Sequence, residues 1–164
     1  DEAKTFAALA KSLGKYKVGI MIETPSIALL VSQLSGVLDF VSVGTNDLSQ
    51  YLFAADRMNP SLGALLNHWQ PALIQSLARI ATDAKLAGVS SGVCGESASD
   101  PAFAIVLAGL GFDSISVSRS QVDAVHNALS SIEIEDAKKV ASAVLQATSA
   151  EEAKAIALRE IGAR

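Results

Sequence analysis

The fold is decided in residues 37–53, VLDFVSVGTNDLSQYLF. The segment 37–43 is rich in β-branched and aliphatic residues, which predicts a buried strand. Gly44 closes this strand, and a short helix is expected over residues 48–53. A strand followed directly by a helix is the repeating unit of α/β proteins, so this stretch indicates that fold class.

The same unit recurs on both sides of this stretch. Three further strands are predicted, over residues 17–22, 89–93 and 115–117. Segments with helical patterns surround them, at residues 3–13, 25–34, 71–85, 101–108 and 121–129. Two of these helices start with a capping residue before proline, Thr24-Pro25 and Asp100-Pro101. Consecutive strands joined by helices run parallel, so the sequence predicts a parallel sheet.

Four strand–helix units amount to about half of a closed eight-unit barrel, which takes roughly 250 residues. We therefore expect residues 1–131 to form half of a TIM-type (β/α)8 barrel. Residues 132–164 are expected to be a C-terminal helical segment packed on the same domain, with helices at 136–146 and 150–161. A half barrel leaves two free sheet edges and an open apolar concave face, which favours association with another half.

Composition limits the functional classes. The 164 residues carry 13 Lys plus Arg against 17 Asp plus Glu, a net charge of -4, which argues against a nucleic-acid-binding protein. The longest apolar run, residues 102–112, is far shorter than the roughly 20 residues of a membrane span. Cys94 is the only cysteine and excludes an intrachain disulfide. These features predict a soluble, cytoplasmic protein.

Polar residues follow the predicted strands, where parallel α/β proteins bind their ligands. The first strand is followed by Glu23, the second by residues 44–47 (GTND), the third by residues 94–96 (CGE) and the fourth by residues 118–119 (SR). Glu23 and Asp47 on neighbouring strand ends are suited to hold Mg²⁺ through carboxylate oxygens. Residues 44–47 precede a helix, so their backbone N–H groups are suited to bind an anion.

Each candidate also has a structural explanation. Glu23 fits a solvated loop residue, and Asp47 fits an acid at a helix N-terminus. Cys94 fits a small buried hydrophobic residue, and Arg57 is suited to pair with Asp56 on the surface. His68 and Trp69 are expected in a loop or packed on the long helix, and His126 is expected on a helix surface.

Four segments in order resemble one family: GIMIETP at residues 19–25, GTNDLSQY at 44–51, DRMN at 56–59 and GVCGE at 92–96. Together they closely resemble the C-terminal, phosphoenolpyruvate-binding barrel of enzyme I of the bacterial sugar phosphotransferase system. Pyruvate phosphate dikinase and phosphoenolpyruvate synthase are more distant relatives of that family. The resemblance runs from about residue 17 to about residue 140.

The resemblance implies a role for each matching residue. Glu23 and Asp47 would bind Mg²⁺, and the backbone at Asn46 and Asp47 would hold phosphoenolpyruvate. Arg57 would neutralise the phosphate, and Cys94 would protonate the enolate carbon as pyruvate forms. In this family a histidine on a separate N-terminal domain receives the phosphoryl group and passes it to a small phosphocarrier protein, and the barrel domain forms a homodimer.

The sequence departs from the family in two respects. The family's His-Pro pair at the start of the long helix is Gln70-Pro71 here, with His68 two positions away. The phosphohistidine domain, the carrier-binding helices and the first half of the barrel, with two substrate-binding arginines, are not in these residues. The 164 residues alone are therefore expected to be inactive. The alternatives are a non-catalytic dimerisation or regulatory half barrel, or the C-terminal part of a dikinase or phosphoenolpyruvate synthase.

Overall fold

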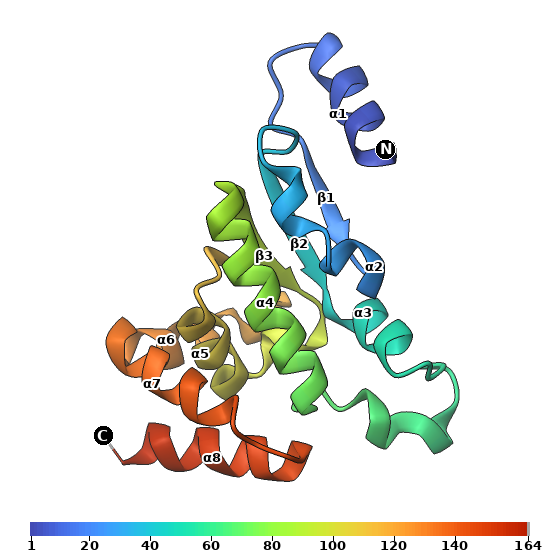
Figure 1. Cartoon of the computed structure of the whole chain (residues 1–164). Coiled ribbons are helices and arrows are strands. Elements are labelled where there is room, and N and C mark those ends of the chain that lie inside the picture. Colours follow the sequence, from blue (N-terminus) through green and yellow to red (C-terminus); the bar gives the residue numbers. More distant parts are fainter. Residues whose placement is uncertain (164) are drawn as a thin grey trace.

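The computed structural model describes residues 1–163 and contains a four-stranded parallel sheet in the order β1-β2-β3-β4 (Figure 1). Its strands are β1 (Gly19–Ile22), β2 (Phe40–Gly44), β3 (Ser90–Cys94) and β4 (Ser114–Ile115). All neighbouring strands are parallel, and their order in the sheet equals their order in the chain. This confirms the α/β class and is consistent with part of a (β/α) barrel.

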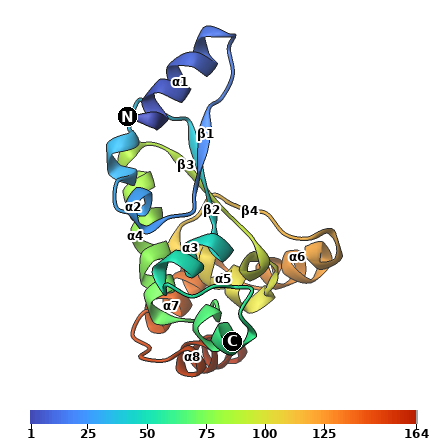
Figure 2. The same ribbon diagram turned by 90° about the vertical axis from the view of Figure 1, so that its right-hand side faces the viewer.

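Helices connect the strands and continue beyond the last one. The α-helices are α1 (Glu2–Ser12), α2 (Pro25–Ala28), α3 (Thr45–Leu52), α4 (Pro71–Ala87), α5 (Pro101–Leu110), α6 (Val122–Ser130), α7 (Ile134–Val144) and α8 (Ala150–Gly162). Short 3₁₀ helices are η1 (Val31–Leu34), η2 (Pro60–Leu66), η3 (Glu96–Ser99) and η4 (Arg119–Gln121). In both views α1 stands at one end of the molecule and α8 at the other (Figures 1 and 2). Within residues 1–163, no helix has the length and apolar character required to span a bilayer.

Two helices differ most from the sequence prediction, and the boundaries of the others lie within two residues of it. The helix expected over residues 25–34 is divided into α2 and η1, because Leu30 N–H donates to the carbonyl of Ile27, a tighter i to i+3 bond. The helix expected from Leu48 begins three residues earlier, at Thr45, directly after β2. Asn46 and Asp47 therefore lie in the first turn of α3, where an acidic side chain is favourable.

The two faces of the sheet differ in character. Val41, Val43 and Val93 are fully buried and form a core with residues of the helices and their connections; the largest of these are Trp69, Phe103, Leu48, Leu73, Ile74 and Leu77. Because side chains alternate along a strand, Phe40 and Ser42 lie on the opposite face. On that face Met21 and Phe40 are exposed, and residues such as Ser42 and Gly92 are small. The expected open apolar face is thus apolar only in part.

The C-terminal helices extend the same core. α7 packs against α5, and α8 packs against α7. The helices approach closely at Gly109, where an added Cβ atom would overlap the carbonyl of Ala137. At the start of α8, Ser149 Oγ accepts a hydrogen bond from Glu152 N–H at 3.1 Å, which is one half of the predicted capping box, while the Glu152 carboxylate accepts a hydrogen bond from Thr148 N–H. A domain boundary at residue 132 remains a prediction.

Candidate functional site

Three of the predicted site residues belong to adjacent strand ends. The register pairs Ile22 with Val43 and Gly44 with Cys94, so Glu23, Gly44 and Cys94 come from neighbouring positions at one edge of the sheet. A Cβ atom added at Gly44 would lie 2.8 Å from both Cγ and Oε1 of Glu23. The Glu23 side chain therefore lies directly over Gly44, and a side chain at position 44 would displace it.

Glu23 is half-buried, which differs from a fully solvated loop residue. Within residues 1–163 it has no hydrogen-bond or ion-pair partner. A half-buried carboxylate that satisfies no protein donor is available to a cation or to solvent. This is the chemistry that a hard divalent ion requires.

Asp47 and Arg57 form an ion pair, with Asp47 Oδ1 and Arg57 Nη1 3.5 Å apart. The alternative pairing of Arg57 with Asp56 is wrong, because Asp56 Oδ1 instead accepts a hydrogen bond from Met58 N–H at 2.8 Å. Both side chains of the observed pair are exposed, and exposed pairs contribute only about 0–1 kcal/mol. Asp47 and Arg57 can therefore exchange this contact for a ligand at small cost.

A hollow of about 410 Å³ lies beside this edge. It is lined by residues of α3, η2, η3 and the connections between them, and these include Asn46, Ser49, Arg57, His68 and Glu96. The hollow brings together the predicted substrate-binding residues Asn46 and Arg57. Glu23, Asp47 and Cys94 do not line it, so the predicted set divides between the hollow and the adjoining sheet edge.

Hydrogen bonds hold α3 against the end of β3. Thr45 Oγ1 donates to the carbonyl of Cys94 at 3.0 Å and lies 2.6 Å from Ser97 Oγ. Glu96 N–H donates to Asn46 Oδ1 at 3.4 Å. Between these contacts Gly95 has φ +106° and ψ -177°, a conformation that is essentially restricted to glycine. The GVCGE segment thus fixes the position of Cys94 relative to Asn46.

Cys94 is partly exposed, so it is not the fully buried cysteine of the structural explanation. Its thiol donates a weak hydrogen bond to the carbonyl of Val43, with the atoms 3.4 Å apart. The Ser42 hydroxyl donates to Cys94 Sγ at 3.6 Å. A thiol held in this way has a defined direction and keeps an exposed surface.

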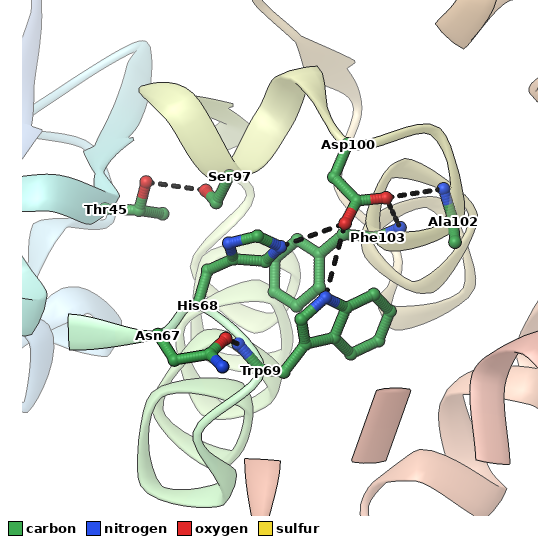
Figure 3. A network of polar contacts seen from close by, with 8 residues as sticks. All are labelled: Thr45, Asn67, His68, Trp69, Ser97, Asp100, Ala102 and Phe103. Carbon is green, nitrogen blue, oxygen red and sulfur yellow. Dashed lines mark hydrogen bonds and ion pairs between the residues drawn. The ribbon is translucent and has the colours of Figure 1, made fainter. Parts of the chain in front are cut away.

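A polar cluster around Asp100 was not identified from the sequence (Figure 3). Asp100 Oδ2 lies 3.1 Å from His68 Nε2 and accepts a hydrogen bond from Trp69 Nε1 at 3.2 Å. Asp100 Oδ1 accepts hydrogen bonds from the N–H groups of Ala102 and Phe103 and so caps α5.

The environment of Asp100 shifts its ionisation. Burial raises the pKa of Asp100, but the hydrogen bond and charge of His68 and the two backbone N–H groups outweigh it and lower the pKa to about 2. The carboxylate is therefore ionised at neutral pH and acts only as an acceptor.

Part of this cluster is indicated by local sequence patterns. Asp100-Pro101 predicts the helix cap, which the structure confirms. Trp69 lies in the connection between η2 and α4, a loop position, and its side chain is fully buried. His126 is exposed on α6, as expected. Nothing local to residues 68 and 69 indicates a partner more than thirty positions away.

Comparisons with known proteins identify the family of this chain. Residues 2–134 match the family model described as PEP-utilising enzyme, PEP-binding domain, where PEP is phosphoenolpyruvate. A phosphoenolpyruvate-protein phosphotransferase of Streptomyces coelicolor is 42% identical over 157 residues, which cover 95% of this chain and 28% of that protein. One of Mycoplasma genitalium is 41% identical over 135 residues, covering 82% of this chain and 24% of the relative. Multiphosphoryl transfer protein 1 of Escherichia coli is 34% identical over 139 residues, which cover 85% of this chain and 17% of that protein.

These relatives are much longer than the matched region. This chain spans 28% of the length of the Streptomyces coelicolor protein and about a quarter or less of the other two. The family model, in contrast, covers most of the chain, including the sheet, α3, the hollow and the Asp100 cluster. The chain therefore belongs to the family of PEP-utilising enzymes and carries its PEP-binding domain.

Proposed function

We propose that this chain is the C-terminal, phosphoenolpyruvate-binding part of a phosphoenolpyruvate-protein phosphotransferase, enzyme I of the sugar phosphotransferase system. In the full-length protein the phosphoryl group passes to a histidine on another domain and then to a small phosphocarrier protein. One observation carries the proposal: Asn46 and Arg57 open into one hollow beside the strand ends that bear Glu23 and Cys94. Groups that neutralise a phosphate thus adjoin a proton donor.

Substrate binding uses the first turn of α3 and Arg57. The first N–H groups of a helix have no partner within it, and those of Asn46 and Asp47 are available to a bound anion. The Arg57 guanidinium adds a full positive charge for the phosphoryl oxygens. Because phosphoryl transfer depends mainly on positioning and charge neutralisation, these contacts account for most of the help this chain supplies.

The residues present fit Mg²⁺. Magnesium is usually bound through one or two carboxylates together with substrate phosphate and water, and Glu23 and Asp47 supply two. Glu23 has no partner in the described part of the chain, and Asp47 has only the exposed contact with Arg57. Described residues contain no cluster of three or more His, Cys, Asp or Glu suited to a metal, so substrate and water would complete the coordination. When bound, the ion neutralises phosphoryl charge.

Cys94 supplies the proton that completes the reaction. The bond between the phosphorus and the enol oxygen breaks, the phosphoryl group goes to the acceptor histidine, and the oxygen keeps the electron pair as the enolate of pyruvate. The methylene carbon then takes the proton of the Cys94 thiol, and the thiolate regains a proton from water. A positioned weak acid is what this step requires.

The test uses the full-length protein that contains these residues. Cys94→Ala should retain phosphoenolpyruvate binding and slow pyruvate formation by roughly 10²-fold or more, as loss of a general acid does. Ser42→Ala, which removes only the hydroxyl that contacts the sulfur, should have a smaller effect. Equal losses of binding and pyruvate formation in Cys94→Ala would reject the proton-donor role.

A second candidate function is association. Within residues 1–163, β1 and β4 each have only one neighbouring strand, so both sheet edges are free to pair. We propose that further barrel strands cover these edges in the full-length protein. We also propose that the protein is a cytoplasmic homodimer. Light scattering tests the dimer. A monomer that still transfers phosphate would leave the catalytic proposal intact and reject the dimer.

A further inference from the structure

His68 faces the same hollow as Asn46 and Arg57, although it comes from the connection between η2 and α4. Its side chain is 32% exposed, so it is accessible from the hollow without being a free surface residue. The proposed reaction assigns it no role. The question is which atom of the imidazole ring a ligand in the hollow would meet.

The ring is held in one orientation by its surroundings. Its edge packs against Phe103, with ring centroids 5.0 Å apart, and it also contacts the fully buried Trp69. Asp100 Oδ2 is 3.1 Å from His68 Nε2. Because the ionised carboxylate can only accept, Nε2 must carry the proton of this hydrogen bond.

The second ring nitrogen, Nδ1, is left for a ligand. In Figure 3 it lies on the side of the ring away from Asp100. Within residues 1–163 it has no hydrogen-bond partner. A ring that is fixed at one nitrogen and open at the other is preorganised to make one directed hydrogen bond.

We propose that His68 is a ligand-binding residue whose Nδ1 atom holds an anionic oxygen of the phosphorylated substrate, and that Asp100 is the positioning residue that fixes its ring. The proposal rests on the proposed function, because it takes phosphoenolpyruvate as the ligand. It adds a contact from the connection between η2 and α4, made by a residue that the family resemblance does not assign.

The charges around the ring define how this contact works. Asp100 and Glu96 are negatively charged, and Arg57, which lines the same hollow as Glu96, is positively charged. Nε2 already carries a proton, so an anion can be held at Nδ1 only when Nδ1 is also protonated. Binding of an anion to a neutral His68 therefore takes up a proton. A residue with a purely structural role would not couple anion binding to proton uptake.

The test is calorimetric titration of the full-length protein with phosphoenolpyruvate and Mg²⁺ in two buffers of different ionisation enthalpy. At about pH 8 an ordinary imidazole is neutral and a phosphate monoester is dianionic. Any proton taken up on binding therefore goes to the protein and not to phosphoenolpyruvate. We expect His68→Gln to weaken binding roughly tenfold, the worth of a hydrogen bond to a charged group, and to reduce proton uptake. His126→Gln removes the other histidine, which is exposed on α6, and should change neither the affinity for phosphoenolpyruvate nor the proton uptake.

A second variant keeps the inference testable if His68→Gln fails to fold. Asp100→Asn keeps the imidazole but removes the acceptor that fixes it, so binding should weaken by a similar factor and proton uptake should fall. Unchanged affinity and uptake in His68→Gln, with normal binding by the unmodified protein, would overturn this inference and leave the proposed function standing. If the unmodified protein fails to bind phosphoenolpyruvate, the proposed function is overturned, and this inference with it.

Discussion

Replacing Asp100 by Asn tests the physical account of the polar cluster most completely. The amide retains an oxygen to cap α5, but its NH₂ group cannot accept from His68 Nε2 and Trp69 Nε1. Trp69 is 1% exposed, so its unpaired N–H group should cost about 1–3 kcal/mol. We expect the free energy of unfolding at neutral pH to fall by about 2 kcal/mol, within this range.

The pH dependence of this loss follows from the ionisation of Asp100. Its pKa falls from 3.8 to about 2 on folding. A folded-state pKa that lies below the unfolded value stabilises the protein above about pH 4, and this contribution disappears as the pH falls through 2. The shift corresponds to about 2 kcal/mol as an upper value, because the Asp100 side chain is 22% exposed and water weakens its interactions.

Urea denaturation of both proteins from about pH 6 down to about pH 2.5 measures this effect. The difference between the unmodified protein and Asp100→Asn should stay nearly constant down to about pH 4 and shrink as the pH falls further. Asp123→Asn is the matched control, since Asp123 is exposed in the first turn of α6, and it should change stability by less than about 0.5 kcal/mol. A difference that stays constant with pH would refute the ionised, hydrogen-bonded Asp100.

Three further substitutions test a close helix contact, a backbone conformation and the proposed metal ligand. Gly109→Ala should destabilise the protein by about 1–3 kcal/mol in urea denaturation, because the new Cβ atom overlaps the backbone of α7; Gly63→Ala, where a Cβ meets nothing within 4 Å, should not. An unchanged midpoint for Gly109→Ala would contradict the close helix packing. Gly95→Ala should cost a similar amount, about 1–3 kcal/mol, from its positive φ, and near-normal thermal unfolding would count against that backbone. Glu23→Gln should change the unfolding free energy by less than about 0.5 kcal/mol but raise the Mg²⁺ concentration needed for phosphorylation, and an unchanged Mg²⁺ requirement would exclude Glu23 as a ligand.

The strand positions were predictable because they depend on local pattern. Val41, Val43 and Val93 form short apolar runs, and these runs are the central strands. The start of α3 was predicted too late because Asn and Asp compete with the helix for backbone hydrogen bonds and usually indicate a turn. Here the parallel pairing of β2 ends at Gly44, and the chain enters the helix at once.

The candidate site was predictable only where residues follow the strands directly. Glu23 and Cys94 are brought to one edge by the sheet register, which parallel pairing implies. The pairing of Arg57 with Asp47 depends on how the chain turns after α3, and no local pattern encodes that turn. The contact between His68 and Asp100 joins two connections distant in sequence, so it required the packing of α4 against α5.

The most direct test of the central claim is a crystal structure of the full-length protein with phosphoenolpyruvate and Mn²⁺, whose anomalous scattering locates the metal. The account predicts a metal bound by Glu23 and Asp47, phosphoryl oxygens bound by Arg57 and the α3 N-terminus, and the Cys94 thiol facing the methylene carbon. A metal or substrate bound away from this edge of the sheet, or a methylene group out of reach of Cys94, would contradict it.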